Sequence, residues 1–432
     1  MRVPALATDR YELTMVQAAL AAGTADRECV FEVFGRRLPS GRRFGVVAGM
    51  SRVLEVLEGL RFDDADLEAL RSGGVVDDRT CEWLARYRFD GDAVAYPDGE
   101  VHVPGSPLLQ VRASFATGVV LETVVLSVLN HDCAVAGAAA RMVVAAEDRP
   151  IVEMGSRRTH EHAAVDAARA AHLAGFTSTS NLEAGVRFGV PTAGTSAHAF
   201  VLLHDSEREA FAAQVAAQGP GTTLLVDTFD IAEGIRAAVE VAGTSLGGVR
   251  IDSGDLAVHA RFARRLLDDL GATGTKVVVS GDLDEHGIAR LSGAPVDVYG
   301  VGTSVVTGSG APTAGLVYKL VEVDGRPVAK RSTGKATHAG AHRVVRRHRA
   351  SGVATEEVLV AGGADVDERP GDRSPQVALL RRGQRTDDTA DSVDLEAARR
   401  RLRERLSTTL PWDALSLSEG DAAFPTTYVG EA

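Results

Sequence analysis

The sequence predicts an α/β protein built from an N-terminal α+β domain, an irregular (β/α) barrel and a C-terminal extension, over residues 1–117, 118–335 and 336–432. Two observations predict the barrel. Helical stretches alternate with short apolar runs from about Gly118, which is the pattern of βα units with a parallel sheet. Several of these runs also end in charged or glycine-containing turns, and barrel active sites lie at the carboxyl ends of the strands.

The first domain is expected to begin with a helix. Thr8 or Asp9 is its predicted N-cap, the helix ends at about Ala22, and Gly23 follows as the C-terminal stop. The other elements expected in this domain are a strand at 29–34, a solvated basic loop at 36–43, helices between 53 and 87, and short strands between 92 and 112.

A positively charged turn and an alanine-rich helix open the segment 154–200. Arg157 and Arg158 follow the apolar pair 151–152, so both guanidinium groups are expected where a strand meets the next helix, at a strand end where ligands bind in α/β folds. A helix is predicted from His160 to Ala174 because alanine is a strong helix former, and Gly175 stands at its C-terminal cap.

Two small polar stretches complete this segment. Residues 177–181 (TSTSN) supply the hydroxyl and backbone N–H groups from which phosphate or sugar sites are made, although such runs also form ordinary turns. Residues 194–198 (GTSAH) place His198 in a tight turn after Pro191. Arginines, hydroxyls and a histidine together indicate phosphate chemistry.

Further strands of the barrel are predicted at 199–203, 223–226, 249–251, 276–279 and 296–301. The strand at 223–226 ends in Asp227 and Asp230, two carboxylates that hold a metal, orient a hydroxyl or cap the next helix. Arg250 lies between two apolar residues and therefore points to the opposite face of its strand. Because a buried arginine needs a partner, either a ligand carboxylate or Asp252 is expected beside it.

Two later strands end in glycine with a polar neighbour. Gly281 is followed by Asp282, and Gly302 by Thr303. Glycine lets backbone N–H groups approach an oxyanion closely, and loops after late barrel strands commonly form the phosphate site, although either turn can be purely structural.

The C-terminal third carries fewer signals. A strand at 318–322 with a turn at Gly325 is expected first, then a solvated basic patch formed by Arg343, Arg346, Arg347 and Arg349. Residues 362–389 are polar and rich in Gly, Pro and Asp, so we expect a loop, and residues 394–406 form an amphipathic helix that packs on the domain.

The composition is that of an ordinary globular protein, with 45% hydrophobic and 25% charged residues among 432. The formal net charge of −12 argues against a general binder of nucleic acid or anionic membranes, because both would repel the surface. Three scattered cysteines (Cys29, Cys81 and Cys133) indicate neither a disulfide framework nor a zinc site, so a cytoplasmic protein is expected. We find no signal peptide and no run of roughly 18 or more apolar residues, so no membrane segment is expected.

The order of these motifs resembles the nicotinate phosphoribosyltransferase family. TDRYELTM at 8–15, GSRR at 155–158, STSN at 178–181, GTSAH at 194–198 and RIDSGD at 250–255 carry the resemblance, which covers roughly residues 7–335. It implies a type II phosphoribosyltransferase fold, in which nicotinate and phosphoribosyl pyrophosphate give nicotinate mononucleotide and pyrophosphate for NAD salvage.

The resemblance also implies a set of site residues. The catalytic group is His198, Arg157, Arg250 and Asp252, and the substrate-binding group is Tyr11, Arg158, Thr179, Ser180, Asn181, Thr195, Asp227, Ser253, Gly281, Gly302 and Thr303. Tyr11 would stack on the pyridine ring from the partner subunit of a homodimer with shared active sites. The glycine turns would hold the 5′-phosphate, and Asp227, Asp230 and Asp282 are candidate magnesium ligands.

Transfer to a pyridine nitrogen needs little acid or base chemistry, because that nitrogen is already a nucleophile. The main task is electrostatic stabilisation of the leaving pyrophosphate and of an oxocarbenium-like sugar. In the family, the histidine that matches His198 is phosphorylated by ATP, which couples ATP hydrolysis to product formation. His160, His162 and His172 are expected to be structural.

Two other functions compete with this interpretation. A quinolinate or nicotinamide phosphoribosyltransferase would share the architecture, and a non-catalytic nucleotide-binding regulator would share the contacts. The segment 178–181 lacks the acidic residue with which nicotinamide-preferring relatives bind the carboxamide, which favours an anionic substrate such as nicotinate. ATP consumption that depends on nicotinate would separate the enzyme from the regulator.

Overall fold

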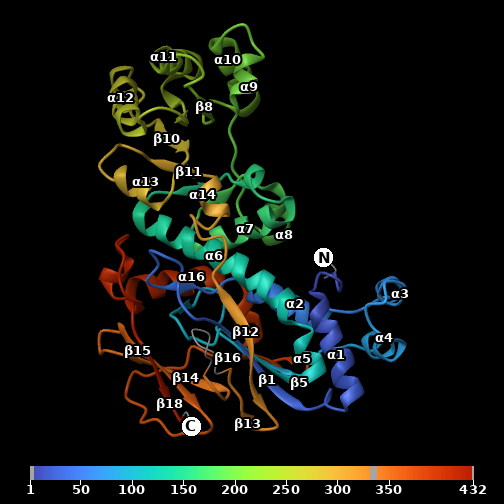
Figure 1. Cartoon of the computed structure of the whole chain (residues 1–432). Helices are drawn as coiled ribbons and strands as arrows, with labels where there is room; N and C mark the ends of the chain where they lie inside the picture. Colours follow the sequence, from blue (N-terminus) through green and yellow to red (C-terminus); the bar gives the residue numbers. More distant parts are fainter. Residues whose placement is uncertain (1–3, 331–337, 431–432) are drawn as a thin grey trace. The chain divides into compact units, whose positions relative to one another are not determined.

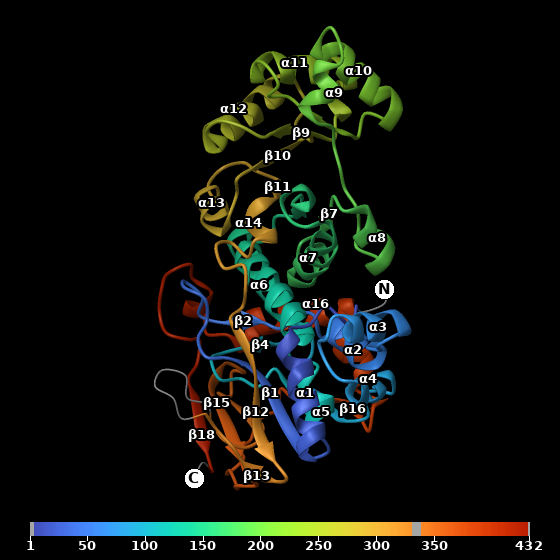
Figure 2. The same cartoon turned by 45° about the vertical axis from the view of Figure 1, so that its right-hand side comes forward.

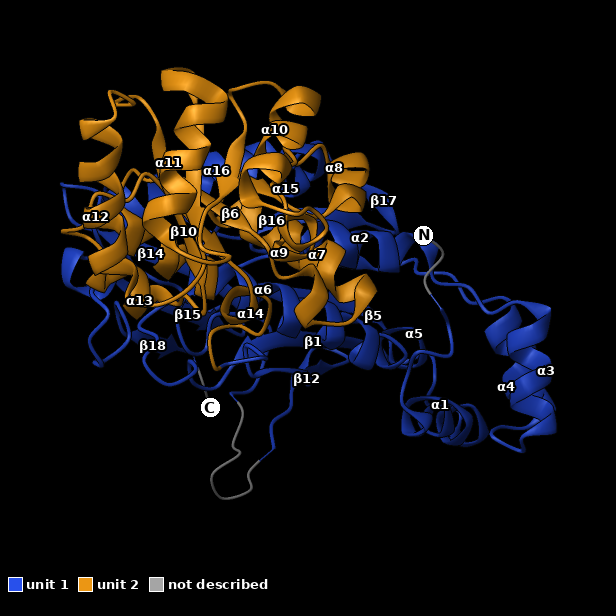
Figure 3. Ribbon diagram, turned by 90° about the horizontal axis from the view of Figure 1, so that it is seen from above, with its two compact units in different colours: residues 1–137, 311–432 blue, residues 138–310 orange. Residues whose placement is uncertain are grey.

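The computed structural model describes residues 4–330 and 338–430 and forms two compact units (Figures 1 and 3). Unit 1 comprises residues 1–137 and 311–432, and unit 2 comprises residues 138–310. The predicted division at residues 117 and 335 differs from these units. The reason is strand pairing, since β16 (Val377–Arg381) runs antiparallel to β3 (Asp92–Ala95) and so joins the C-terminal residues to the N-terminal domain.

The main sheet of unit 1 has seven strands, and every neighbouring pair is antiparallel. Its order is β13 (Arg326–Pro327), β12 (Leu316–Val323), β1 (Glu28–Gly35), β5 (Leu109–Ser114), β3, β16 and β17 (Gln384–Arg385). Two smaller sheets consist of β14 (His342–His348), β15 (Ala354–Ala361) and β18 (Thr426–Val429), and of β2 (Gly45–Val46) and β4 (Val101–His102).

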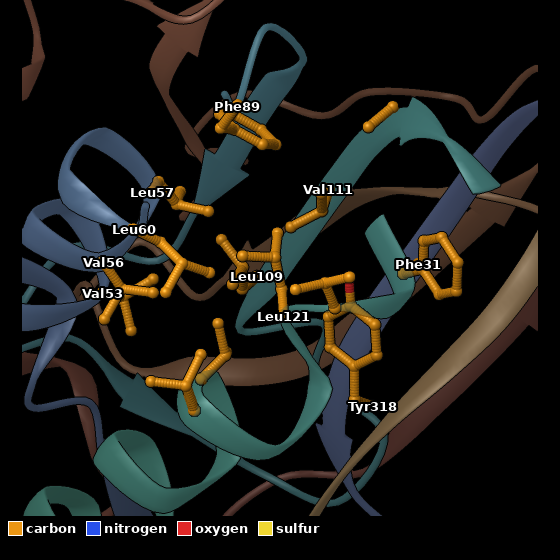
Figure 4. Close-up of a cluster of buried hydrophobic side chains, with 14 of the residues drawn as sticks. Phe31, Val53, Val56, Leu57, Leu60, Phe89, Leu109, Val111, Leu121 and Tyr318 are labelled. Carbon is orange, nitrogen blue, oxygen red and sulfur yellow. The ribbon is translucent and has the colours of Figure 1, made fainter. Parts of the chain in front are cut away.

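Helices cover the main sheet, and the hydrophobic core lies between the helices and the sheet. The helices are α1 (Arg10–Ala22), α2 (Met50–Gly59), α3 (Asp64–Ser72), α4 (Asp78–Ala85), α5 (Phe115–Val119), the start of α6 (Glu122–Ala146), α15 (Thr389–Val393), α16 (Leu395–Glu404) and two short turns, η3 (Arg405–Thr409) and η4 (Trp412–Leu415). Figure 4 shows Leu109 and Val111 of β5 beside apolar side chains of α2. Phe31 stacks on Tyr318 with ring centroids 5.0 Å apart, which fixes β1 against β12.

Unit 2 contains a parallel sheet of six strands (Figure 2). Its order is β7 (Ser178–Thr179), β6 (Ile151–Glu153), β11 (Val298–Val301), β10 (Lys276–Gly281), β9 (Gly248–Ile251) and β8 (Thr223–Leu225). Helices follow the strands, namely η1 (Ser156–Arg158), α7 (Glu161–Ala174), α8 (Leu182–Phe188), α9 (His198–Leu202), α10 (Glu207–Gln218), α11 (Ile231–Ala242), η2 (Gly243–Ser245), α12 (Leu256–Asp269), α13 (Glu285–Arg290) and α14 (Thr303–Val306). The sheet curls into half a barrel, so the predicted α/β class and barrel-like domain are confirmed.

Two predicted elements are wrong. The run at 199–203 is not a strand, because His198–Leu202 forms α9 and the apolar Leu202 and Leu203 remain exposed. Periodicity does not separate a strand from a helix in so short an apolar run. The predicted loop at 362–389 contains β16 and β17, and the pairing of β16 with the distant β3 leaves no local signal.

One helical stretch is more apolar than we expected. The stretch Phe115–Ala146 is long and apolar enough to cross a membrane by length and composition, but 67% of its most apolar window is buried inside the structure. Within it, the carboxylate of Asp132 is fully buried and pairs with Arg52 of α2 at 2.8 Å. The central helix of a soluble protein has the same composition, so this stretch is weak support for a membrane span.

Arg346 contradicts the predicted solvated basic patch, because its side chain is fully buried in unit 1. Its guanidinium group donates to Glu357 and Glu100, both at 2.6 Å, and to the carbonyl oxygen of Val101 at 2.8 Å. Burial would raise the pKa of Glu100, but Arg346 and two further arginines lower it to about 2. Arg343, on the same strand, behaves as predicted and stays about half exposed beside Glu368.

Arg346→Ala should lower the free energy of unfolding by about 3–5 kcal/mol, because it leaves the buried carboxylate of Glu357 without its cation and removes one of the three arginines around Glu100. Arg343→Ala removes an exposed ion pair from the same strand and should cost about 0–1 kcal/mol. Chemical denaturation of both variants measures the difference. Equal losses would mean that the buried network contributes no more than a surface pair.

Candidate active site

The candidate residues of unit 2 lie at one edge of its sheet. All six strands are parallel, so their carboxyl ends meet at the same edge. The register brings neighbouring ends together, since Gly281 of β10 lies opposite Val301 of β11, and Val279 lies opposite Ile251 of β9. Residues that are far apart in the sequence therefore surround one region.

Arg250 is held by several partners on the β9 and β10 side of this edge. Its guanidinium group donates to Ser280 Oγ at 2.8 Å, to Asp252 Oδ1 at 2.9 Å and to Thr195 Oγ1 at 3.2 Å. Of the two partners that the sequence left open, the structure therefore contains Asp252. Burial would raise the pKa of Asp252, but Ser280 and Arg250 lower it below its ordinary value, so the carboxylate is ionised at neutral pH.

The two carboxylates after β8 have different roles. Asp227 Oδ2 accepts hydrogen bonds from the backbone N–H of Asp252 at 2.8 Å and from Ser253 Oγ at 2.6 Å, so Asp227 orients the turn after β9. Asp230 caps α11 by accepting from the N–H of Glu233 at 3.0 Å. Asp282 is exposed.

The described residues contain no cluster of three or more His, Cys, Asp or Glu side chains that could hold a metal ion. One observation nevertheless fits a magnesium ion. Oδ1 of Asp227 is buried and has no hydrogen-bond partner within the described part of the chain. Magnesium is usually bound through one or two carboxylates together with substrate phosphates and water, so a single free carboxylate oxygen suits it.

His198 begins α9 beside this cluster. Its Nδ1 lies 3.1 Å from Thr228 Oγ1, and the ring is half-buried. His198 is the last of the groups that lower the pKa of Asp252, so the two side chains are close. The structure thus brings the predicted His198, Thr195, Arg250 and Asp252 together.

Arg157 and Arg158 lie in η1, which follows β6. Both side chains are exposed. Neither forms an ion pair or a side-chain hydrogen bond to residues 4–330 or 338–430. Two uncompensated guanidinium groups at the edge of the sheet are suited to bind a phosphate or pyrophosphate.

The predicted polar run after α7 is mostly bonded internally. Thr179 is fully buried, and its hydroxyl donates to Glu153 Oε2 at 2.5 Å. Asn181 caps α8 and donates to Ser156 Oγ at 3.0 Å. Ser180 is exposed. The structure therefore gives Thr179 and Asn181 protein partners, and of the three side chains only that of Ser180 is exposed to a ligand.

The two turns favour glycine for different reasons, namely the positive φ of Gly281 and the close packing at Gly302. A Cβ atom on Gly281, whose φ is 136°, would lie 3.4 Å from the carbonyl oxygen of Asp252, and one on Gly302 would lie 3.2 Å from that of Met154. Thr303, at the start of α14, is exposed. Both turns present bare backbone at the same edge, as a phosphate site requires.

Tyr11 belongs to unit 1, where it lies in the first turn of α1. Its side chain is 45% exposed, which leaves ring surface available for stacking. Burial, followed by Glu122 and Glu12, raises the pKa of Tyr11 to about 12, so the phenol is neutral at physiological pH.

Comparisons with known proteins show the family of this chain. The sequence matches the nicotinate phosphoribosyltransferase (NAPRTase) N-terminal domain over residues 6–130 and the nicotinate phosphoribosyltransferase (NAPRTase) family over residues 150–351. It is 56% identical over 430 residues to the Mycobacterium tuberculosis protein named nicotinate phosphoribosyltransferase pncB1, covering 98% of this chain and 94% of the relative. The chain belongs to the nicotinate phosphoribosyltransferase family.

More distant relatives support the family assignment, and solved structures share the fold. The human nicotinate phosphoribosyltransferase is 33% identical over 392 residues, with 75% of this chain and 73% of the relative covered. The crystal structure of human nicotinic acid phosphoribosyltransferase superposes with a TM-score of 0.83 at 27% identity, covering 98% and 97% of the two chains. A nicotinate-nucleotide pyrophosphorylase from Pyrococcus furiosus, at 24% identity and a TM-score of 0.76, shares the fold.

Several further residues contact the candidate site, and sequence reasoning gave none of them a specific role. Glu153, Ser280 and Thr228 each contact a predicted residue. Glu153 and Ser280 are polar residues that end apolar strands, which is the signal that could have found them. Glu207 was also missed. Burial, with the nearby charges of Asp227 and Asp230, raises its pKa to about 7.

Glu207 should make stability depend on pH near neutrality. Folding raises the pKa of Glu207 from 4.5 to about 7. The contribution of this side chain to the free energy of unfolding is therefore fully present below pH 4.5 and is lost as the pH rises through 7. The melting temperature of the wild type should therefore fall between pH 5 and pH 8 by more than that of Glu207→Gln. Glu209→Gln, an exposed position on the same helix, should retain the wild-type profile. Parallel profiles for all three proteins would contradict the assignment.

Proposed function

We propose that this chain transfers the phosphoribosyl group of phosphoribosyl pyrophosphate to nicotinate, and so forms nicotinate mononucleotide and pyrophosphate for NAD salvage. The relatives with this name, at up to 56% identity over nearly the whole chain, support the proposal. The observation that carries it is the placement of two uncompensated arginines, an Arg250–Asp252 pair and two bare glycine turns at one edge of a parallel sheet.

These residues divide the substrate between them. Arg157 and Arg158 hold the pyrophosphate, and the backbone of the Gly281 and Gly302 turns holds the 5′-phosphate. The pyridine nitrogen attacks C1 of the ribose while the bond from C1 to the pyrophosphate oxygen breaks, and pyrophosphate leaves with the electron pair. Asp252 remains ionised because of its lowered pKa, so it stabilises the positive charge that develops on the sugar.

Magnesium would be held at Asp227, whose buried Oδ1 is free to bind a cation. When bound, the ion neutralises charge on the phosphate oxygens and so makes pyrophosphate a better leaving group. Asp227 also holds Ser253 and the backbone of Asp252, so it would place the ion beside the residue that faces the sugar.

His198 suits the coupling to ATP. If its Nδ1–H donates to Thr228, the lone pair of Nε2 is free to attack the γ-phosphorus of ATP. The bond from that phosphorus to the bridging oxygen then breaks, and ADP leaves. The phosphohistidine lies next to Asp252 and Arg250, so its hydrolysis can be linked to the state of the substrate site.

A cytoplasmic homodimer with shared sites is the proposed assembly. Leu182 and Val186 of α8 are 73% and 85% exposed, and Leu202 and Leu203 are 62% and 75% exposed. A soluble protein gains by covering such apolar side chains, and a second copy of the chain could also bring Tyr11 to the site.

Purified protein incubated with phosphoribosyl pyrophosphate, magnesium and ATP should convert nicotinate, but neither nicotinamide nor quinolinate, to its mononucleotide, with release of ADP. His198→Ala should still form product but lose the ADP release that depends on nicotinate. His204→Ala removes a histidine just beyond the same helix, whose ring bonds to the Phe200 carbonyl oxygen and packs edge-on against the Phe200 ring, so both activities should persist.

Mass spectrometry identifies the nucleotide, and an ADP assay follows the coupling. Product from quinolinate alone or from nicotinamide alone would make the chain a phosphoribosyltransferase for that substrate. No product from any of the three substrates would favour a non-catalytic nucleotide-binding regulator. Unchanged ADP release in His198→Ala would remove the phosphohistidine from the mechanism.

A further inference from the structure

Glu153 is one member of a closed ring of hydrogen bonds that joins the loops after β6 and β7. It ends β6 and is 1% exposed. One of its carboxylate oxygens accepts a hydrogen bond from the N–H of Gly155, and the other accepts from Thr179 Oγ1 at 2.5 Å. The same side chain therefore holds both loops.

The remaining members close the ring. The N–H of Asn181 donates to Thr179 Oγ1 at 2.9 Å, and Nδ2 of Asn181 donates to Ser156 Oγ at 3.0 Å. Ser156 is bonded covalently to Gly155, where the ring began. Five residues of two loops thus support one another, and no member can move without breaking a hydrogen bond.

The ring fixes the start of the turn that carries Arg157 and Arg158. The turn is also pressed against Gly302, which follows β11, and against the end of α14, because a Cβ atom on Gly155 would lie 2.8 Å from the carbonyl oxygen of Gly302 and 2.3 Å from Val306 Cγ1. A shift of this turn would therefore move the arginine pair relative to the Gly302 turn, which is the other candidate anion site.

No cation is paired with Glu153 within residues 4–330 and 338–430. Burial raises the pKa of its carboxyl group, and the hydrogen bonds from Thr179 and Gly155 offset this only in part. A buried carboxyl group costs stability unless all of its hydrogen bonds are made. Here both carboxylate oxygens accept a hydrogen bond, and both donors belong to the loops of the candidate site.

We propose that Glu153 is a positioning residue that sets the distance between the Arg157–Arg158 pair and the Gly302 turn, and hence the fit of the site to the two phosphate ends of phosphoribosyl pyrophosphate. This inference rests on the proposed function. Glu153 acts through the ring and does not itself touch the substrate.

Three variants and a control test the ring. Glu153→Ala opens it at two hydrogen bonds, and Ser156→Ala opens it at one hydrogen bond with little effect on folding. Glu153→Gln keeps it closed with one hydrogen bond reversed, because the amide oxygen can accept from Gly155 and the amide nitrogen can donate to Thr179 Oγ1, whose two lone pairs accept from Asn181 as well. Thr177→Ala is the matched control, since its hydroxyl bonds to the carbonyl oxygen of Ile151 at 3.0 Å, at the opposite end of the same two strands.

The KM for phosphoribosyl pyrophosphate should rise roughly 10- to 100-fold in Glu153→Ala and by less in Ser156→Ala, because small misplacements of binding groups have effects of this size. The KM for ATP, which binds beside His198, should stay within twofold. Glu153→Gln and Thr177→Ala should resemble the wild type. Calorimetric titration with pyrophosphate alone should show the same order of affinities without any turnover.

Several results would overturn the inference. One is that Glu153→Ala and Ser156→Ala keep the wild-type KM and the wild-type pyrophosphate affinity. Another is that they lose activity for all substrates equally, as a destabilised protein would. If Glu153→Ala does not fold, Ser156→Ala decides the question. If the wild type makes no nucleotide from nicotinate, the proposed function fails, and the pyrophosphate titrations still decide the role of Glu153.

Discussion

The six strands of the unit 2 sheet run in the same direction, and every candidate group of that unit depends on this arrangement. Parallel strands bring their carboxyl ends to one edge, so Glu153 at the end of β6 and Val301 at the end of β11 become neighbours although more than a hundred positions separate them in the sequence. In an antiparallel sheet, half of these ends would lie at the opposite edge. The chemistry of the site is thus a consequence of strand direction before any side chain is considered.

Charge is distributed unevenly along that edge. Arg250 is neutralised by Asp252, whereas Arg157 and Arg158 meet no carboxylate within the described residues. A chain with a net charge of −12 can bind an anionic substrate only where positive charge is concentrated locally. The β6 side of the edge provides this concentration, and the β9 side provides a carboxylate that stays ionised.

Polar side chains fix the loops on both sides. The bonds of Asp227 to Ser253 and to the backbone of Asp252 hold the turn after β9, and the ring around Glu153 holds the turn after β6. Unit 1 uses the same device for a different purpose, since Arg346 joins β14 to the segment around Glu100 and so binds the C-terminal residues to the N-terminal domain. Buried polar networks of this kind specify one arrangement only when every member is satisfied.

The sequence by itself determined the parallel strands at 151–153, 223–225, 249–251 and 276–279, the helix caps at Gly23 and Gly175, and the residue types of the site, because these follow from local periodicity, local conformational preference and recognisable motifs. Only the tertiary structure decided that Ser280 of β10 holds Arg250 of β9, that Thr179 faces Glu153, and that Arg346 is buried. The physical reason is that these partners come from different strands. Which side chains meet is set by register and packing between segments distant in the chain, and no local pattern contains that information.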